Sequence, residues 1–282
     1  MKFYVPAFFL SLLIGITSLE STSHEPEESC IQVIDLPGRD SIFLNPVYFC
    51  VDISGRYFYY SSLKTTVCND TLCQLVLLNV FWDPAGNYSR FDTLPGKPLT
   101  KNDHIPFTVL DYKKLHATLS NENSILGEKS IDELIDKKRT RYSEKIDAVT
   151  GATVMEIKSA VVDGALYSTY TLWHLINGDI QQEIREHTLL KYNAALEDQL
   201  LSSDNPKTIL FGVKNLNETY YFNRFEKIVD LMKSGNPLVN FYIAKNIPEG
   251  VLAKKENTMS IRGIWNDLDR NTQSVLSKYI IP

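Results

Sequence analysis

The stretch Gln74-Leu-Val-Leu-Leu-Asn-Val-Phe-Trp82, followed by Asp83-Pro-Ala-Gly86 and Asn87-Tyr-Ser-Arg-Phe91, carries the strongest signal for the fold. The first segment is an apolar run of strand length, and the second contains the residue types of a tight turn. The third segment contains aromatic residues, which are common in strands. A strand, a turn and a second strand are therefore predicted over residues 74–91.

Similar segments lie upstream of this pair. Residues 41–51 are rich in aromatic and β-branched side chains, turn residues follow at 52–55, and residues 56–61 include four consecutive aromatic side chains. Short strands separated by Gly, Pro, Asn and Asp predict an antiparallel meander between residue 31 and about residue 100. The aromatic density there favours core packing over a ligand platform.

The period of the apolar residues changes after residue 107. Residues 109–119 and 131–135 have a helical pattern, and the longest such pattern covers residues 153–175, where Gly178 is placed to end the helix. The sequence therefore predicts an α+β domain over residues 21–183, with helices packed on an antiparallel sheet.

The remainder, residues 184–282, reads as purely helical and contains an internal repeat. Ser203-Asp-Asn-Pro206 recurs 31 residues later as Ser234-Gly-Asn-Pro237, and a weaker third unit covers residues 265–280. Each unit reads as a helix, an Asn-Pro turn and a second helix that begins with Pro. This pattern predicts a short solenoid-like helical repeat that offers a surface to a partner protein. A plain helical cap on the first domain is the alternative.

Composition excludes several classes of protein. Of the 282 residues 44% are hydrophobic and 22% are charged, which is not the composition of a disordered chain. The chain has 34 acidic and 29 basic residues, a formal net charge of −5, and so lacks the charge of a general nucleic-acid binder. No nucleic-acid partner is predicted.

The N-terminus has the order of a secretory signal. Met1-Lys2 precedes an apolar run at residues 3–16, and small or polar residues follow up to Ser23. We expect residues 1–20 to be a signal peptide and the protein to be exported, either periplasmic or secreted, free or associated with the membrane. The first cysteine is Cys30, too far from the apolar run for a lipoprotein signal, so no lipid anchor is predicted.

The four cysteines are Cys30, Cys50, Cys68 and Cys73, and an even count suits an oxidising compartment. Three pairings are possible, and Cys30–Cys50 with a local Cys68–Cys73 bridge is preferred. A metal site is the weaker interpretation, because neither a second close cysteine pair nor a nearby histidine completes a zinc ligand set.

The residues that point to chemistry are Asp147-Ala-Val-Thr-Gly-Ala-Thr153, at the start of the longest helical pattern. Gly151 and Ala152 allow a ligand to approach the backbone, and the helix start predicts an anion or phosphate site beside Thr153. The alternative is structural, because Thr153 and Glu156 have the spacing of a capping box.

Asp147, Thr150, Gly151, Ala152 and Thr153 match the pattern D-x-x-[ST]-G-A-T. This motif resembles the FMN-binding domain family of exported flavoproteins, which includes flavin subunits of the sodium-pumping quinone reductase and of the ion-translocating ferredoxin oxidoreductase. The resemblance implies FMN joined to Thr153 by a phosphoester bond that an extracytoplasmic flavin transferase installs. The other four residues would complete the recognition loop. The resemblance also implies an antiparallel sheet with packed helices. The chain departs from the family upstream, where residues 103–108 lack the Glu and Gly of the usual Glu-Thr-Pro-Gly-like stretch.

The expected function is extracytoplasmic electron transfer by a bound FMN, with a redox partner protein at or near the membrane. The flavin would supply the redox chemistry, so an electron carrier is expected rather than a self-contained enzyme, with no catalytic residue and no metal site. Motifs of dinucleotide, P-loop, zinc-protease and serine-hydrolase sites are absent from the sequence.

Two alternatives remain. In the first, the protein is a non-catalytic binding module, the loop at 147–153 is a structural cap or a non-covalent flavin sensor site, and the helical tail binds a partner. In the second, Cys68 and Cys73 serve a secreted enzyme or chaperone.

Overall fold

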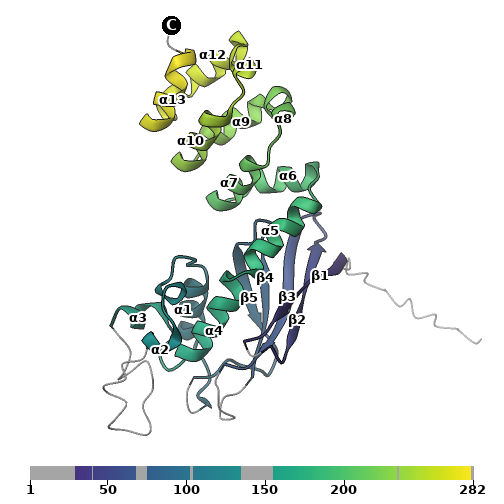
Figure 1. The fold of residues 1–282 in the computed structure, drawn as a ribbon, viewed down its shortest axis with the longest axis vertical. Coiled ribbons are helices and arrows are strands. Elements are labelled where there is room, and N and C mark those ends of the chain that lie inside the picture. The colour runs from purple at the N-terminus through teal and green to yellow at the C-terminus, as the bar shows by residue number, and fades with distance from the viewer. Residues whose placement is uncertain are drawn as a thin grey trace, which may run out of the picture.

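The protein is described from a computed structural model, which covers residues 29–39, 41–67, 75–101, 104–134, 155–233 and 235–280. A sheet with packed helices forms one part of the molecule, and an array of helices continues from it (Figure 1).

Five strands form one antiparallel sheet in chain order: β1 (Ser29–Pro37), β2 (Leu44–Val51), β3 (Tyr57–Thr65), β4 (Val76–Trp82) and β5 (Tyr88–Thr93). Each strand pairs with the next one along the chain, so the predicted antiparallel sheet is confirmed. Side chains alternate between the two faces, and in β4 every second residue is buried. One face of the sheet therefore belongs to the core.

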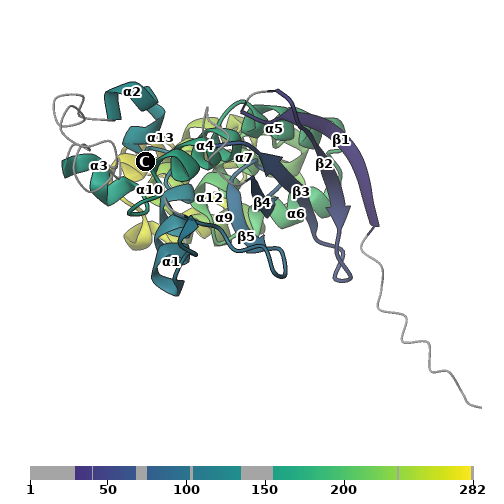
Figure 2. The same cartoon turned by 90° about the horizontal axis from the view of Figure 1, so that it is seen from below.

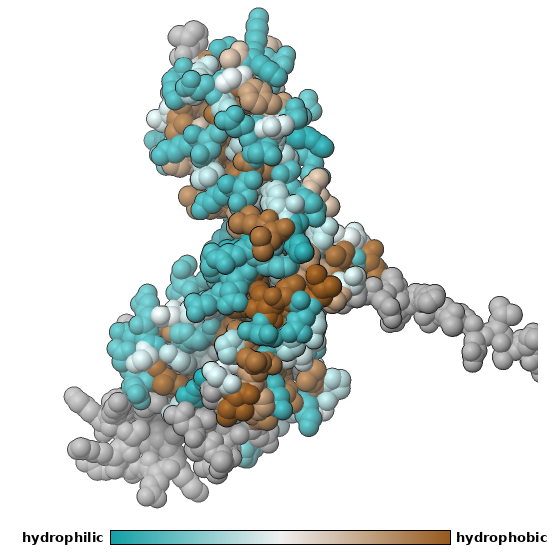
Figure 3. Space-filling view, turned by 45° about the vertical axis from the view of Figure 1, so that its right-hand side comes forward, coloured by the Kyte–Doolittle hydropathy of each residue, from teal (hydrophilic) through white to brown (hydrophobic). Residues whose placement is uncertain are grey.

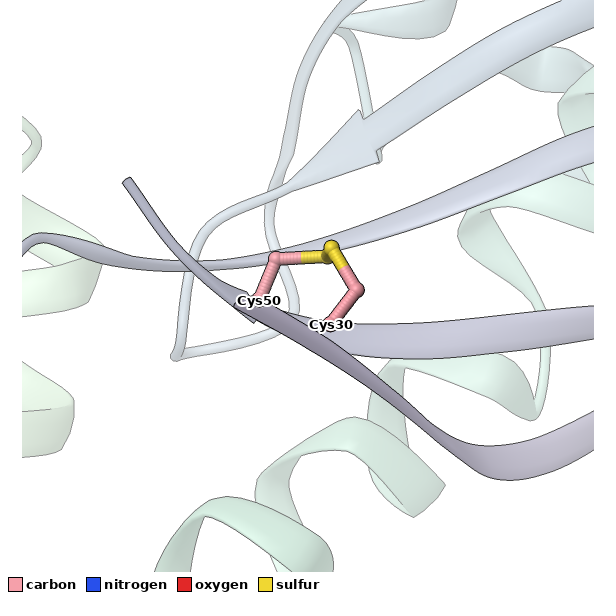
Figure 4. The surroundings of a disulfide bond; sticks show 2 residues. All are labelled: Cys30 and Cys50. Carbon is pink, nitrogen blue, oxygen red and sulfur yellow. A yellow bond between two sulfur atoms is a disulfide. The ribbon is translucent and has the colours of Figure 1, made fainter. Parts of the chain in front are cut away.

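The predicted disulfide between Cys30 and Cys50 is confirmed. The two cysteines lie directly opposite each other on β1 and β2, as Figure 4 shows, and the bond ties the edge strand to its neighbour. Cys68 and Cys73 lie outside the described residues, so their pairing stays a prediction. A disulfide is compatible with an extracytoplasmic protein.

The helices of the first part are α1 (Val109–Leu119), the 3₁₀ turn η2 (Ile125–Gly127), α2 (Ile131–Leu134), α3 (Met155–Ala160), α4 (Leu166–Asn177) and α5 (Ile180–Leu190). Both α4 and α5 lie across one face of the sheet (Figures 1 and 2). The indole nitrogen of Trp82 donates to the Ile176 carbonyl at 3.0 Å, and the sheet, α1, α4 and α5 share one hydrophobic core.

The prediction of one continuous helix over residues 153–175 is wrong, because α3 and α4 are separate helices. Between them the chain turns at Gly164, whose φ of +75° lies in the left-handed region that glycine adopts without strain. Just before it, Val161 and Val162 are both fully buried, and the Val162 N–H donates to the Thr169 hydroxyl. Gly164 thus allows the chain to turn so that both valines reach the core.

The helical array consists of α6 (Ala194–Leu201), α7 (Pro206–Lys214), α8 (Glu218–Asn223), α9 (Phe225–Lys233), α10 (Pro237–Asn246), α11 (Glu249–Leu252), α12 (Lys255–Gly263), the 3₁₀ turn η4 (Trp265–Asp267) and α13 (Arg270–Ile280). The starts of α9, α10 and α11 follow those of α6, α7 and α8 by 31 residues each. Among the described helices, none combines the length and the apolar character that a membrane crossing requires.

The two Asn-Pro sequences begin helices in the same way. Asn205 caps α7 and accepts from the Lys207 N–H, while Asn236 caps α10 and accepts from the Leu238 N–H. In both helices the following proline occupies the first position, where its missing N–H is not needed. The starts of α7 and α10 therefore share one local geometry.

Candidate functional site

The predicted cofactor loop lies outside the described residues. This applies to all five predicted binding residues, which are Asp147, Thr150, Gly151, Ala152 and Thr153. The described chain resumes two residues later with α3, at Met155. The flavin role of the loop therefore stays a prediction.

Three of the described histidines of the first part join elements of the fold. The Nδ1 atoms of His187 and His116 lie 2.8 Å from the hydroxyls of Tyr59 and Tyr88, respectively, and His174 Nε2 lies 2.9 Å from the Leu126 carbonyl. Burial lowers the pKa of both His174 and His187. No cluster of three or more metal-ligating side chains occurs within the described ranges.

The turn between β4 and β5 connects the sheet to the array. The Asp83 carboxylate accepts from the backbone N–H groups of Ala85 and Asn87, each at 2.9 Å, and from the Thr208 hydroxyl on α7. The Asn87 side chain donates to the Thr208 hydroxyl at 2.9 Å, and burial raises the pKa of Asp83. This carboxylate is fully occupied by structural hydrogen bonds.

A second contact lies beside that turn. Gln199 of α6 accepts from the Tyr57 N–H and donates to the Tyr57 carbonyl, both at 2.7 Å, as a neighbouring strand would. Ala85, Leu196 and Leu200 form a small buried cluster between these groups. The first helix pair of the array is thus attached firmly to one end of the sheet.

The rest of the array has a core of its own. The hydrogen bonds described above that attach the array to the sheet come from α6 and α7. Residues of α9 to α13 bury their apolar side chains in a separate cluster within residues 201–280. Figure 1 shows these helices, in green to yellow, extending away from the sheet. On the face seen in Figure 3 they are mostly hydrophilic.

The second helices of the three pairs, α7, α10 and α13, lie side by side along one side of the array (Figure 1). In each helix the third and seventh residues are buried: Thr208 and Gly212, Val239 and Ile243, and Thr272 and Leu276. The second, fifth and ninth residues share the opposite side, because these positions fall on one helical stripe.

These positions form a surface that we call the outer face. It consists of Lys207, Leu210 and Lys214 on α7, Leu238, Phe241 and Lys245 on α10, and Asn271, Ser274 and Lys278 on α13. Leu210 and Phe241 are half-buried, and the other seven side chains are exposed. Leu238, on the middle helix α10, is 61% exposed.

No family model, curated protein or solved structure matches this chain. The resemblance to the FMN-binding domain family therefore depends on residues 147–153.

Sequence reasoning did not find the outer face. The signal was present, since the internal repeat aligns Lys214 with Lys245. Assigning these lysines to one surface required the helix starts, because a shift of one residue rotates a side chain by about 100° around the helix.

Proposed function

We propose that this protein is an extracytoplasmic binding module in which α9 to α13 contact a partner protein. The observation that carries the proposal is that these helices extend from the sheet with a hydrophobic core of their own. The disulfide is compatible with an extracytoplasmic location. The helix pairs are interpreted as a short solenoid-like repeat.

A helical cap on the sheet would bury its apolar side chains against the sheet. Here α9 to α13 bury them against one another and against residues of α6 to α8, in a cluster that contains no residue of the sheet. Stacked helix pairs typically use their extended surfaces to bind other molecules. Leu238, exposed at the middle of the outer face, marks the expected contact.

The test is site-specific photo-crosslinking in cells that export the full-length protein. A benzoylphenylalanine is placed at position 238 on α10, and the matched control carries it at position 44 on β2, where Leu44 is 65% exposed. We expect a discrete crosslinked product from position 238 and none from position 44. Absence of a product from position 238, or equal products from both positions, contradicts the proposal.

A second candidate function rests on the motif at residues 147–153. In it the protein carries FMN on Thr153, with Asp147, Thr150, Gly151 and Ala152 forming the surrounding loop, and it transfers electrons outside the cytoplasm. A flavin transferase would attach the FMN, and the helical array would contact the redox partner near the membrane.

Intact-mass measurement of protein co-produced with a flavin transferase in an exporting host tests this candidate. The expected result is a mass increase of one FMN less water that survives denaturation and is lost in Thr153→Ala. A yellow protein that loses its colour on denaturation supports the non-covalent sensor site instead. Unmodified, colourless wild-type protein contradicts both forms.

A further inference from the structure

We infer that the outer face binds an acidic protein segment that also carries apolar side chains, in helical conformation. This inference rests on the proposed binding function of α9 to α13, extends the contact surface to α7 and names the chemistry of the partner.

Carboxylates are unevenly distributed among the helices of the array. The three helices of the outer face contain five cationic residues and no carboxylate: Lys207, Lys214, Lys245, Arg270 and Lys278. The first helices of the pairs, α6, α9 and α12, each contain carboxylates, and in α9 and α12 these are mixed with cationic residues. Because the whole chain has a net charge of −5, the cationic face does not follow from composition and indicates an anionic partner.

The lysines recur with the helices. Lys214, Lys245 and Lys278 are each the ninth residue of their helix and are all exposed. Packed helix axes lie about 8–10 Å apart, so neighbouring lysines are displaced by about that distance. In a partner helix each residue rises about 1.5 Å, so carboxylates at every seventh residue lie about 10 Å apart along the axis. An acidic helix laid across the row can therefore meet the lysines in register.

Aromatic rings position these lysines. The Lys214 ammonium on α7 lies 5.8 Å from the centre of the Tyr242 ring on α10, and that of Lys245 lies 4.9 Å from the Phe241 ring. Cation–π contacts of this kind restrain the ammonium groups without neutralising them. In the part of the chain that the structure describes, no carboxylate lies within ion-pair distance of Lys214 or Lys245.

The ends of the row have carboxylates nearby. Lys207 pairs with Glu122 at 2.6 Å. At the other end, Tyr279 raises the pKa of Lys278, and the Tyr279 hydroxyl donates to Glu249 at 3.1 Å. Lys214 and Lys245 are therefore the lysines of the outer face that depend most on an external anion.

The apolar residues of the outer face favour a protein segment over other anions. Leu238 is 61% exposed and Phe241 beside it is half-buried, between the lysines of α7 and α10. A nucleic acid or sulfated glycan would leave Leu238 without an apolar partner. An anionic membrane would require more protruding apolar side chains than this one leucine.

The test measures binding of a fluorescein-labelled 21-residue helical peptide to the full chain by fluorescence anisotropy. The peptide has Glu at every seventh position with Leu and Ala between, and a second peptide has Lys in place of Glu. We expect the acidic peptide alone to bind. The double variant Lys214→Glu/Lys245→Glu should weaken its binding at least tenfold, and Leu238→Ser at least threefold. The matched control Lys233→Glu/Lys255→Glu, on α9 and α12, has the same charge change and should weaken it less than twofold.

Several outcomes overturn the inference: no binding of the acidic peptide, equal weakening by the control variant, or no effect of Leu238→Ser. Stronger binding of phosphatidylserine vesicles or heparin than of the peptide, with the same dependence on Lys214 and Lys245, also overturns it. Circular dichroism confirms that every variant is folded.

The crosslinking experiment separates this inference from the proposed function. A product from position 238 that persists in Lys214→Glu/Lys245→Glu contradicts the acidic partner and leaves the binding function intact. Absence of any product from position 238 contradicts the binding function itself.

Discussion

At the scale of single residues, Gly86 has a position that no other residue can occupy without strain. Its φ is +76°, and a Cβ atom there would lie 2.5 Å from the Gln181 carbonyl oxygen on α5. The turn that binds Thr208 through Asp83 therefore requires glycine both for its backbone conformation and for its close approach to α5.

We predict that Gly86→Ala lowers the free energy of unfolding by about 2–5 kcal/mol, since the left-handed cost of about 1–2 kcal/mol adds to an overpacking cost of about 1–3 kcal/mol. The control is Gly55→Ala, where φ is +79° and no atom lies within 4 Å of the added Cβ. This control should lower the free energy of unfolding by only about 1–2 kcal/mol. Urea denaturation measures both, and equal losses contradict the prediction.

His187 gives the protein a pH dependence of stability. Its pKa is lowered mainly by burial and also by Lys191, so the unfolded state binds a proton at a higher pH than the folded state does. Stability should therefore be full above the ordinary histidine pKa of about 6.5 and should fall as pH drops toward the lowered value.

We predict that His187→Gln makes the decrease in unfolding free energy between pH 7 and pH 5 shallower than in the wild type. Part of the decrease should remain in the variant, because the pKa of His174 is also lowered by burial. Denaturation at several pH values measures the slope. An unchanged slope in the variant excludes this role for His187.

At the scale of elements, β1 depends on its covalent bond to β2. It is an edge strand with mostly exposed side chains, so few buried contacts hold it to the sheet. The disulfide closes a segment of 20 residues.

We expect Cys30→Ala/Cys50→Ala to lower the free energy of unfolding by about 3 kcal/mol, the loop-closure entropy for a segment of that length. Denaturation without reductant measures the loss, and wild-type protein under reducing conditions is the comparison. A loss below about 1 kcal/mol would show that backbone pairing alone holds β1.

At the scale of the whole molecule, two hydrophobic cores meet at a small joint. Leu78 is fully buried in the core of the sheet, and Ile243 is fully buried in the core of the array. The joint contains Ala85, Leu196 and Leu200 together with the hydrogen bonds of Asp83 and Gln199.

We predict that Ile243→Ala destabilises the array by about 2–5 kcal/mol and leaves the sheet intact, because its cavity lies in the separate core. Hydrogen exchange should quicken in α9 to α13 and stay unchanged in β3 and β4. Leu78→Ala is the matched control and should show the reverse. Faster exchange throughout the molecule in both variants would mean that the two cores unfold as one unit.

Local signals explain what could be predicted. The apolar run and turn at residues 74–91 predicted β4 and β5, because alternation and turn chemistry act within a few residues. The Asn-Pro pairs predicted the starts of α7 and α10, because a capping side chain and a missing N–H are local constraints. The preference for Cys30–Cys50 followed from an even cysteine count and from the local bridge expected between Cys68 and Cys73, which leaves the other two cysteines to pair.

Long-range contacts explain what could not be predicted. The sequence pattern joined α3 and α4 into one helix, whereas burial of Val161 and Val162 in the shared core requires the turn at Gly164. Asp83 looked like an ordinary turn residue, and only the fold places Thr208, 125 residues away, against it.

The sequence by itself determined the strands of the sheet and the starts of α7 and α10, because each depends on neighbouring residues. It favoured the pairing of Cys30 with Cys50, and the register of β1 against β2 decided it. Only the tertiary structure decided where the sheet ends, how the array attaches and which side chains form the outer face. Lys214, Lys245 and Lys278 belong to one surface because their helices pack side by side. That packing depends on apolar residues spread over the whole of residues 201–280.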